Sequence, residues 1–265
     1  MFELRVQLTK TQKILVGALT VVGILGLWVL VTTLEWVQPS TLPGPLGLLE
    51  AVPKMHYEKF LIANSAVSLL RITLGFLIAS LLAVPLGILM GSFGPVRAAF
   101  NPLVGPLRFL PIAAVVPIFI FWFGLGETMK VALLAVGTFV YLLPLVVESV
   151  DQVEEVYLKA AATLGASRFQ RIRTILVPAS LPAIYEALRV MFGLGWTYVM
   201  LAEFVSEESG VLGYGGVGYL INNLRRYGSM ADILVAVGAI LLIGVLVDLL
   251  LGYLGKTLFP WYSKT

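Results

Sequence analysis

A few ionisable residues stand inside long apolar stretches of this 265-residue chain, namely Arg71, Glu186, Arg189, Glu203 and Asp248. A charged group is costly in an apolar medium, so such residues usually mark a pathway or a partner charge. For Arg71 two roles are open: a structural ion pair with Glu203, or a cation that lines a cavity and attracts an anion. Glu186 and Arg189 can neutralise each other on one helix. Asp248 is expected to hydrogen-bond between helices or at a helix end.

No set of residues predicts a reaction. Gly255-Lys256-Thr257 is similar to the end of a phosphate-binding loop, but Leu250 stands where that loop requires glycine and no strand precedes it. His56 is the only histidine and has no neighbouring ligand set, and there is no cysteine. We therefore expect no catalytic site, no metal site and no cofactor bound by this chain.

A short polar segment, 151–179, lies between apolar runs. Its first half predicts a helix over Glu154 to Leu164 that ends at Gly165 in a left-handed conformation. Ser167 and Gln170 form a capping box that starts a second short helix, and Pro178 and Pro182 are expected to end the segment as the next apolar run begins.

Small residues in this segment allow the backbone to approach a partner closely. Ala160, Ala161, Ala162, Gly165 and Ala166 meet this need. The full set expected to contact the partner is Lys159, Ala160, Ala161, Gly165, Ala166, Ser167 and Arg168. Arg171, like Arg168, is available for charge pairing with the partner surface.

The composition places the chain in a bilayer. Hydrophobic residues make up 59% of it and charged residues 12%, and the mean hydropathy is +0.96. Apolar runs of the length that a membrane helix needs cover Ile14 to Leu34, Ile72 to Val96, Phe109 to Gly126, Val131 to Val147, about Ser180 to Val205 and about Asp232 to Gly255. The runs do not alternate with polar residues as barrel strands do. We predict an all-α membrane protein with about six transmembrane helices in a single domain, 1–265.

Two features of these spans concern packing. Prolines at 102, 106, 111 and 117 predict a kinked third span whose freed backbone groups face protein or a water-lined cavity. Gly87 and Gly91 allow close helix approach, either within one subunit or between subunits.

Lysine and arginine near the span ends predict the orientation. With the N-terminus inside, the inner side holds Arg5, Lys10, Lys13, Arg97, Arg108, Lys159, Arg168, Arg171, Arg173, Lys256 and Lys264, and the outer side holds Lys54, Lys59, Lys130, Arg225 and Arg226. Residues 1–13, segment 151–179 and the C-terminus are thus expected in the cytoplasm. Segment 35–63, with a short helix around Leu46 to Ala51, and the glycine-rich loop 206–230 are expected outside. The basic excess needs no nucleic acid to explain it.

The polar segment resembles the conserved cytoplasmic loop of permease subunits of binding-protein-dependent ABC importers. That pattern is Glu-Ala-Ala, three residues, Gly, nine residues, Ile, one residue, Leu-Pro; here it reads Lys159, Ala160, Ala161, Gly165, Ile175, Val177, Pro178. Spacing is kept, while Lys159 replaces the Glu and Val177 the Leu. Further similarity to the nitrate, sulfonate, taurine and bicarbonate branch lies in Ser68-Leu-Leu-Arg71, Gly165-Ala-Ser167, Trp196-Thr197 and Ala202-Glu203.

The resemblance implies a type I importer core with a cytoplasmic coupling helix in the membrane of a bacterium. It implies a second permease copy, two cytoplasmic ATP-binding subunits that hold ATP and Mg²⁺, and an external solute-binding protein. Arg71, Arg189 and Glu203 are then the candidate residues of the translocation pathway, and a small oxyanion is the expected solute. The rival hypotheses are a stand-alone secondary transporter or channel, and a membrane scaffold. A secondary transporter would be expected to contain an internal repeat, and none is found between the halves of the sequence.

Overall fold

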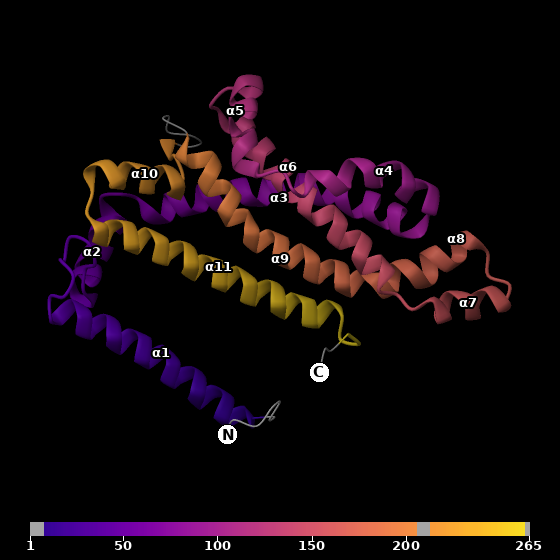
Figure 1. The fold of residues 1–265 in the computed structure, drawn as a ribbon, viewed down its shortest axis with the longest axis horizontal. Coiled ribbons are helices and arrows are strands. Elements are labelled where there is room, and N and C mark those ends of the chain that lie inside the picture. Colours follow the sequence, from indigo (N-terminus) through magenta and orange to yellow (C-terminus); the bar gives the residue numbers. More distant parts are fainter. Residues whose placement is uncertain (1–7, 206–212, 263–265) are drawn as a thin grey trace.

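The computed structural model describes residues 8–205 and 213–262, and every regular element in these ranges is helical (Figure 1). The elements are α1 (Lys10–Thr33), α2 (Pro45–Tyr57), α3 (Leu61–Ser92), α4 (Gly94–Leu107), α5 (Ile112–Phe123), α6 (Glu127–Asp151), α7 (Glu155–Thr163), α8 (Arg168–Arg171), the π-helical turn η1 (Ile172–Leu176), α9 (Val177–Phe204), α10 (Val217–Tyr227) and α11 (Met230–Leu258). The expected all-α membrane fold is confirmed.

Five helical runs are long and apolar enough to cross a membrane, and a sixth is counted if α4 and α5 together make one span. These two helices are bent by 99° at their junction. We expected one kinked helix over Phe109 to Gly126, and this is wrong because two helices meet there at a sharp angle. The first of them, α4, begins at Gly94, among residues that we had assigned to the second span and the connection after it. Pro111 stands immediately before α5, and a proline lacks the N–H that would continue the preceding helix.

The centre of the bundle is formed by α3, α6 and α9, which pack along their lengths. Glycines of α3 allow its backbone to approach α6: a Cβ at Gly75 would lie 2.5 Å from the Leu134 Cβ, and one at Gly87 would lie 2.6 Å from a methyl of Val146. Gly91 faces Val150 in the same way. The Gly87 and Gly91 pair thus packs within one subunit.

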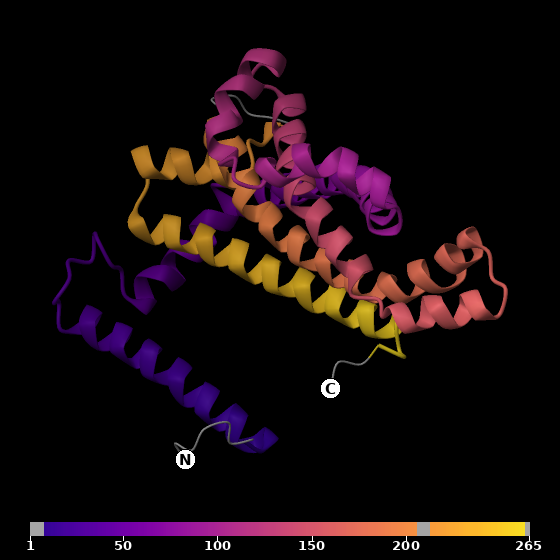
Figure 2. The ribbon, with the colours of Figure 1, turned by 45° about the vertical axis from the view of Figure 1, so that its right-hand side comes forward.

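Helix α1 stands apart from this centre. It contains no buried residue, and two views show it separated from the bundle and joined to it through the segment that carries α2 (Figures 1 and 2). Helix α2, longer than the short helix expected here, packs against α11.

Helices α7 and α8 form a hairpin that projects from one end of the bundle, while α10 lies at the opposite end (Figure 2). Gly165 has the expected left-handed conformation, with φ +85°, and the expected Ser167 capping box starts the second helix of the hairpin. However, Pro178 and Pro182 do not end the segment, because a helical run continues from Arg168 to Phe204. Its π-helical turn ends where Val177 N–H donates to Ile172 C=O, just before Pro178, and such wider turns accommodate locally altered hydrogen bonding.

The expected loop 206–230 is wrong in part, because α10 occupies residues 217–227 of it. Its buried residues Val217, Leu220, Ile221 and Leu224 follow helical spacing. The expectation for 206–212 lies outside the described residues.

Candidate functional site

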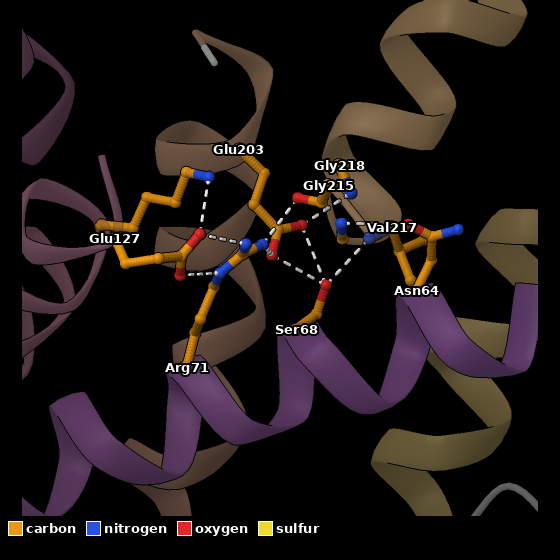
Figure 3. A network of polar contacts seen from close by, with 10 residues as sticks. Asn64, Ser68, Arg71, Glu127, Glu203, Gly215, Val217 and Gly218 are labelled. Atoms are coloured by element: carbon orange, nitrogen blue, oxygen red, sulfur yellow. Dashed lines mark hydrogen bonds and ion pairs between the residues drawn. The ribbon is translucent and has the colours of Figure 1, made fainter. Parts of the chain in front are cut away.

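Arg71 lies at the centre of a buried cluster of charges between α3, α6 and α9 (Figure 3). Its guanidinium donates from Nε to Glu127 Oε2 at 2.7 Å and from Nη1 to Glu203 Oε1 at 2.7 Å. A third hydrogen bond, from Nη2 to Glu127, makes the contact with Glu127 bidentate. Arg71 is 1% exposed and Glu203 is fully buried. The ion pair between Arg71 and Glu203 is therefore present.

Lys130 completes the cluster from one turn further along α6. Its Nζ donates to Glu127 Oε1 at 3.0 Å, and its side chain is almost fully buried. With all four groups ionised, the two cations balance the two carboxylates. A buried charge is tolerated when it is paired and hydrogen-bonded, so the geometry is that of a self-compensated network.

Glu203 also caps α10 from another helix. Gly218 N–H donates to Glu203 Oε2 at 2.8 Å, and Val217 N–H donates to the Ser68 hydroxyl at 2.8 Å. The Ser68 hydroxyl in turn donates to the Glu203 carboxylate. A carboxylate at the start of a helix satisfies its free N–H groups and its positive dipole end.

The segment before α10 must contain glycine to make these contacts. Gly216 has φ +95°, and a Cβ there would lie 2.2 Å from Glu203 Oε1. Gly216 N–H donates to Asn64 Oδ1 at 3.0 Å, and Arg71 Nη1 donates to the Gly215 carbonyl at 2.6 Å. The cluster thus fastens α10 to α3 and α9.

Sequence reasoning found Arg71 and Glu203 but missed Glu127, Lys130, Ser68 and Asn64 as their partners. Glu127 and Lys130 stand at the edge of an apolar run, where charges are expected anyway. A usable signal for Ser68 and Asn64 was their helical spacing with Arg71, which places them on one face of α3.

Arg189 lies far from the cluster, toward the hairpin end of α9. It makes a bidentate pair with Asp248 of α11, with both N···O distances 2.6 Å, whereas its distance to Glu186 is 3.7 Å. The expected neutralisation within α9 is thus the weaker contact, and the expectation that Asp248 bonds between helices is confirmed. A role for Arg189, Arg71 or Glu203 in the translocation pathway stays a prediction.

The hairpin carries the residues expected to contact a partner. Lys159, Ala160, Gly165, Ser167 and Arg168 are exposed on it, and Ala161 and Ala166 are partly buried. Lys159, which replaces the Glu of the pattern, pairs with Glu155 one turn earlier at 2.6 Å. The hydrogen bond from Lys159, and then its charge, hold the pKa of Glu155 below its usual value.

The described residues contain no group of three or more histidine, cysteine or acidic residues that could hold a metal ion. The bundle of apolar helices buries a paired charge network at one end and projects a small-residue hairpin at the other, and its family match gives its class as the membrane component of a transport system. Residues 83–260 match the family described as "Binding-protein-dependent transport system inner membrane component", and the chain belongs to it.

Two curated relatives align over most of the chain. The taurine transport system permease protein TauC of Escherichia coli (strain K12) is 32% identical over 254 residues, which are 94% of this chain and 90% of that protein. The bicarbonate transport system permease protein CmpB of Synechococcus elongatus is 28% identical over 249 residues, which are 90% and 88% of the two chains.

Solved structures support the fold. A chain of the MetNI methionine ABC transporter in an inward-facing conformation superposes with a TM-score of 0.63 at 17% identity, covering 77% of this chain and 96% of that one. The protein is thus a multi-pass permease subunit of an ABC importer in the inner membrane, as expected, and a stand-alone secondary transporter or channel is not favoured.

Proposed function

We propose that two copies of this chain form the membrane pore of an importer, and that the α7–α8 hairpin docks each copy onto a cytoplasmic subunit that binds ATP and Mg²⁺. ATP hydrolysis takes place on those subunits, and this chain converts their movement into opening and closing of the pore. The hairpin end then faces the cytoplasm and both termini lie on that side.

The exposure of the hairpin is the observation that carries this proposal. Helix α7 contains no buried residue, and Leu164 and Phe169, which flank the turn, are 88% and 70% exposed. Large apolar side chains that gather on a projecting element mark an interaction site. The hairpin also continues without a break into α9, so that a force on it reaches the bundle.

The end of the bundle that carries α10 would then face the external solute-binding protein. The family description names transport as binding-protein-dependent, and the outward-facing Arg225 and Arg226 are exposed there. Lipid would cover the apolar outer faces of the spans.

A small oxyanion is the proposed solute. The two relatives are named for taurine, which carries a sulfonate, and for bicarbonate. Arg71 lends no direct support, because its charge is balanced by Glu127 and Glu203. Selection of the solute is therefore assigned mainly to the binding protein, which delivers it to the pore.

The docking proposal is tested by removing the two exposed side chains of the hairpin. We expect Leu164→Ala with Phe169→Ala to lower the affinity for the ATP-binding subunit by about tenfold or more, since central apolar contacts dominate interfaces. Uptake of a labelled sulfonate, measured with the cognate binding protein, should fall in parallel.

Leu46→Ala with Leu49→Ala is the matched control, because these leucines of α2 are 76% and 67% exposed and lie at the other end of the molecule. It should leave copurification of the ATP-binding subunit unchanged. Retention of that subunit and of uptake by the hairpin variant would refute the docking role.

A further inference from the structure

A cavity of about 350 Å³ lies behind the base of the hairpin. One wall is the junction of α3 and α4, from Ser92 to Pro95, and the other is made by α7, α8 and η1 with Leu158, Arg168 and Arg171. The cavity therefore joins the end of a membrane span to the element proposed to move.

Two arginines, Arg168 and Arg171, line this cavity, and no acidic residue is among the described residues that line it. Nearby cations have acidic partners: Arg97 pairs with Asp151, and Lys159 pairs with Glu155. By contrast, no ion pair of Arg168 or Arg171 occurs within residues 8–205 and 213–262. The cavity is thus a local excess of positive charge.

Two residues that line the cavity each carry a buried side-chain donor atom that is unsatisfied. Neither Ser92 Oγ nor Arg171 Nε has a hydrogen-bond partner in the described part of the chain. Leaving a buried donor without an acceptor is unfavourable, so an acceptor is favoured here. Arg171 as a whole is partly buried, and its expected charge pairing with a partner stays a prediction. The start of the 14-residue helix α4 lies on the same wall and adds partial positive charge.

We propose that this cavity binds a phosphate group, with the Arg171 and Arg168 guanidinium groups and the Ser92 hydroxyl as donors. The phosphate belongs to the headgroup of an anionic phospholipid or is free phosphate. A lipid fits the surroundings, because Ser92 ends the α3 span and Phe93, Leu158 and Leu176 line the same cavity. Basic pockets beside membrane helices are typical headgroup sites.

The bound phosphate links α8 to the α3–α4 junction and so stabilises the position of the hairpin relative to α3. This inference goes beyond the docking of the hairpin and does not depend on it, since the cavity is formed by this chain alone. Binding is therefore measured on the full-length permease without ATP-binding subunits.

The test uses delipidated permease in detergent, with phosphatidylglycerol or phosphatidylcholine added and bound lipid counted by native mass spectrometry. Wild type is expected to retain phosphatidylglycerol in preference to phosphatidylcholine. Arg171→Gln should weaken this binding about tenfold, because it removes a charge-assisted hydrogen bond. Ser92→Ala, a milder change, should weaken it a few-fold.

Arg173→Gln is the matched control, because Arg173 is exposed two positions away and does not line the cavity. It should leave lipid binding unchanged. Labelled inorganic phosphate, tested in parallel by equilibrium dialysis, identifies the source: Arg171-dependent binding of inorganic phosphate alone would support free phosphate.

Three results would overturn the proposal. One is equal lipid and phosphate binding by wild type and Arg171→Gln, and another is an equal loss in Arg173→Gln. The third is no binding of either probe, with Arg171 protected from phenylglyoxal only when the ATP-binding subunit is present, which would make a partner carboxylate the occupant.

Discussion

Glu203 serves two elements at once, because the same carboxylate pairs with Arg71 and caps α10. Removing one partner of a buried ion pair leaves an uncompensated charge, which is strongly destabilising. The exposed pairs of this chain, such as Lys159 with Glu155, gain little in comparison.

We expect Glu203→Gln to destabilise the protein by about 3 kcal/mol. The amide keeps the size of the side chain but leaves Arg71 and Lys130 with Glu127 as their one acidic partner. The fraction of protein that stays monodisperse after heating, measured by size-exclusion chromatography, reports the loss. Glu186→Gln is the control, since Glu186 is half exposed and lies 3.7 Å from Arg189; an equal shift in both variants would contradict a special role for the cluster.

The sequence identified the charged residues within the spans, but it identified the ion-pair partner correctly for Arg71 and not for Arg189. Glu203 was named as the partner of Arg71 in one of the two roles left open for that arginine, since both residues stand toward the outer ends of their spans. Arg189 was assigned to Glu186 by spacing on one helix, yet the bidentate geometry favours Asp248 of α11. Such partners depend on how helices rotate against one another, which one apolar sequence does not determine.

Among the helices, locally encoded features were predicted best. The hairpin follows from helix propensity, a left-handed glycine and a capping box, all within a few residues. Helix α10 was missed because the glycines before it and at its start obscured the spacing of its apolar residues. Gly216 and Gly218 are required there because Glu203, which is distant in the sequence, packs against them.

The contact between α3 and α6 gives a prediction for the central helices. Gly87→Ala should destabilise the bundle by about 1–3 kcal/mol, because the new methyl overlaps the Val146 side chain and must displace α6. Thermal unfolding in detergent measures the effect.

Gly238→Ala in α11 provides the comparison, since a Cβ there meets nothing within 4 Å. This substitution should be neutral or stabilise the helix by up to about 1 kcal/mol. If Gly87→Ala were equally harmless, the close approach of α3 and α6 would not be a source of stability.

For the whole molecule, hydropathy was sufficient to predict the membrane class. The expected number of about six spans agrees with the five found, or six if α4 and α5 make one span. Hydropathy did not predict the separation of α1 from the bundle. The prolines predicted a kink in the third span but not the angle of 99° between α4 and α5. The position of α1 depends on contacts that apolar composition does not distinguish, because packing against lipid and packing against protein require similar side chains.

The proposed orientation can be tested because the chain contains no cysteine. Thr163→Cys lies on the hairpin and Arg226→Cys at the opposite end, and both positions are exposed. In intact cells a membrane-impermeant maleimide should label the cysteine at 226 and should reach the one at 163 only after permeabilisation. Labelling at 163 in intact cells would invert the assigned topology.

The uninterrupted helical run from Arg168 to Phe204 has a mechanical consequence. Its 37 residues span about 55 Å at 1.5 Å per residue, so a tilt of about 10° about one end would swing the other by about 10 Å. Glu203 stands next to that far end and is tied to α3 and α10. A small rocking at the hairpin would thus be magnified across the bilayer into a displacement as wide as a helix.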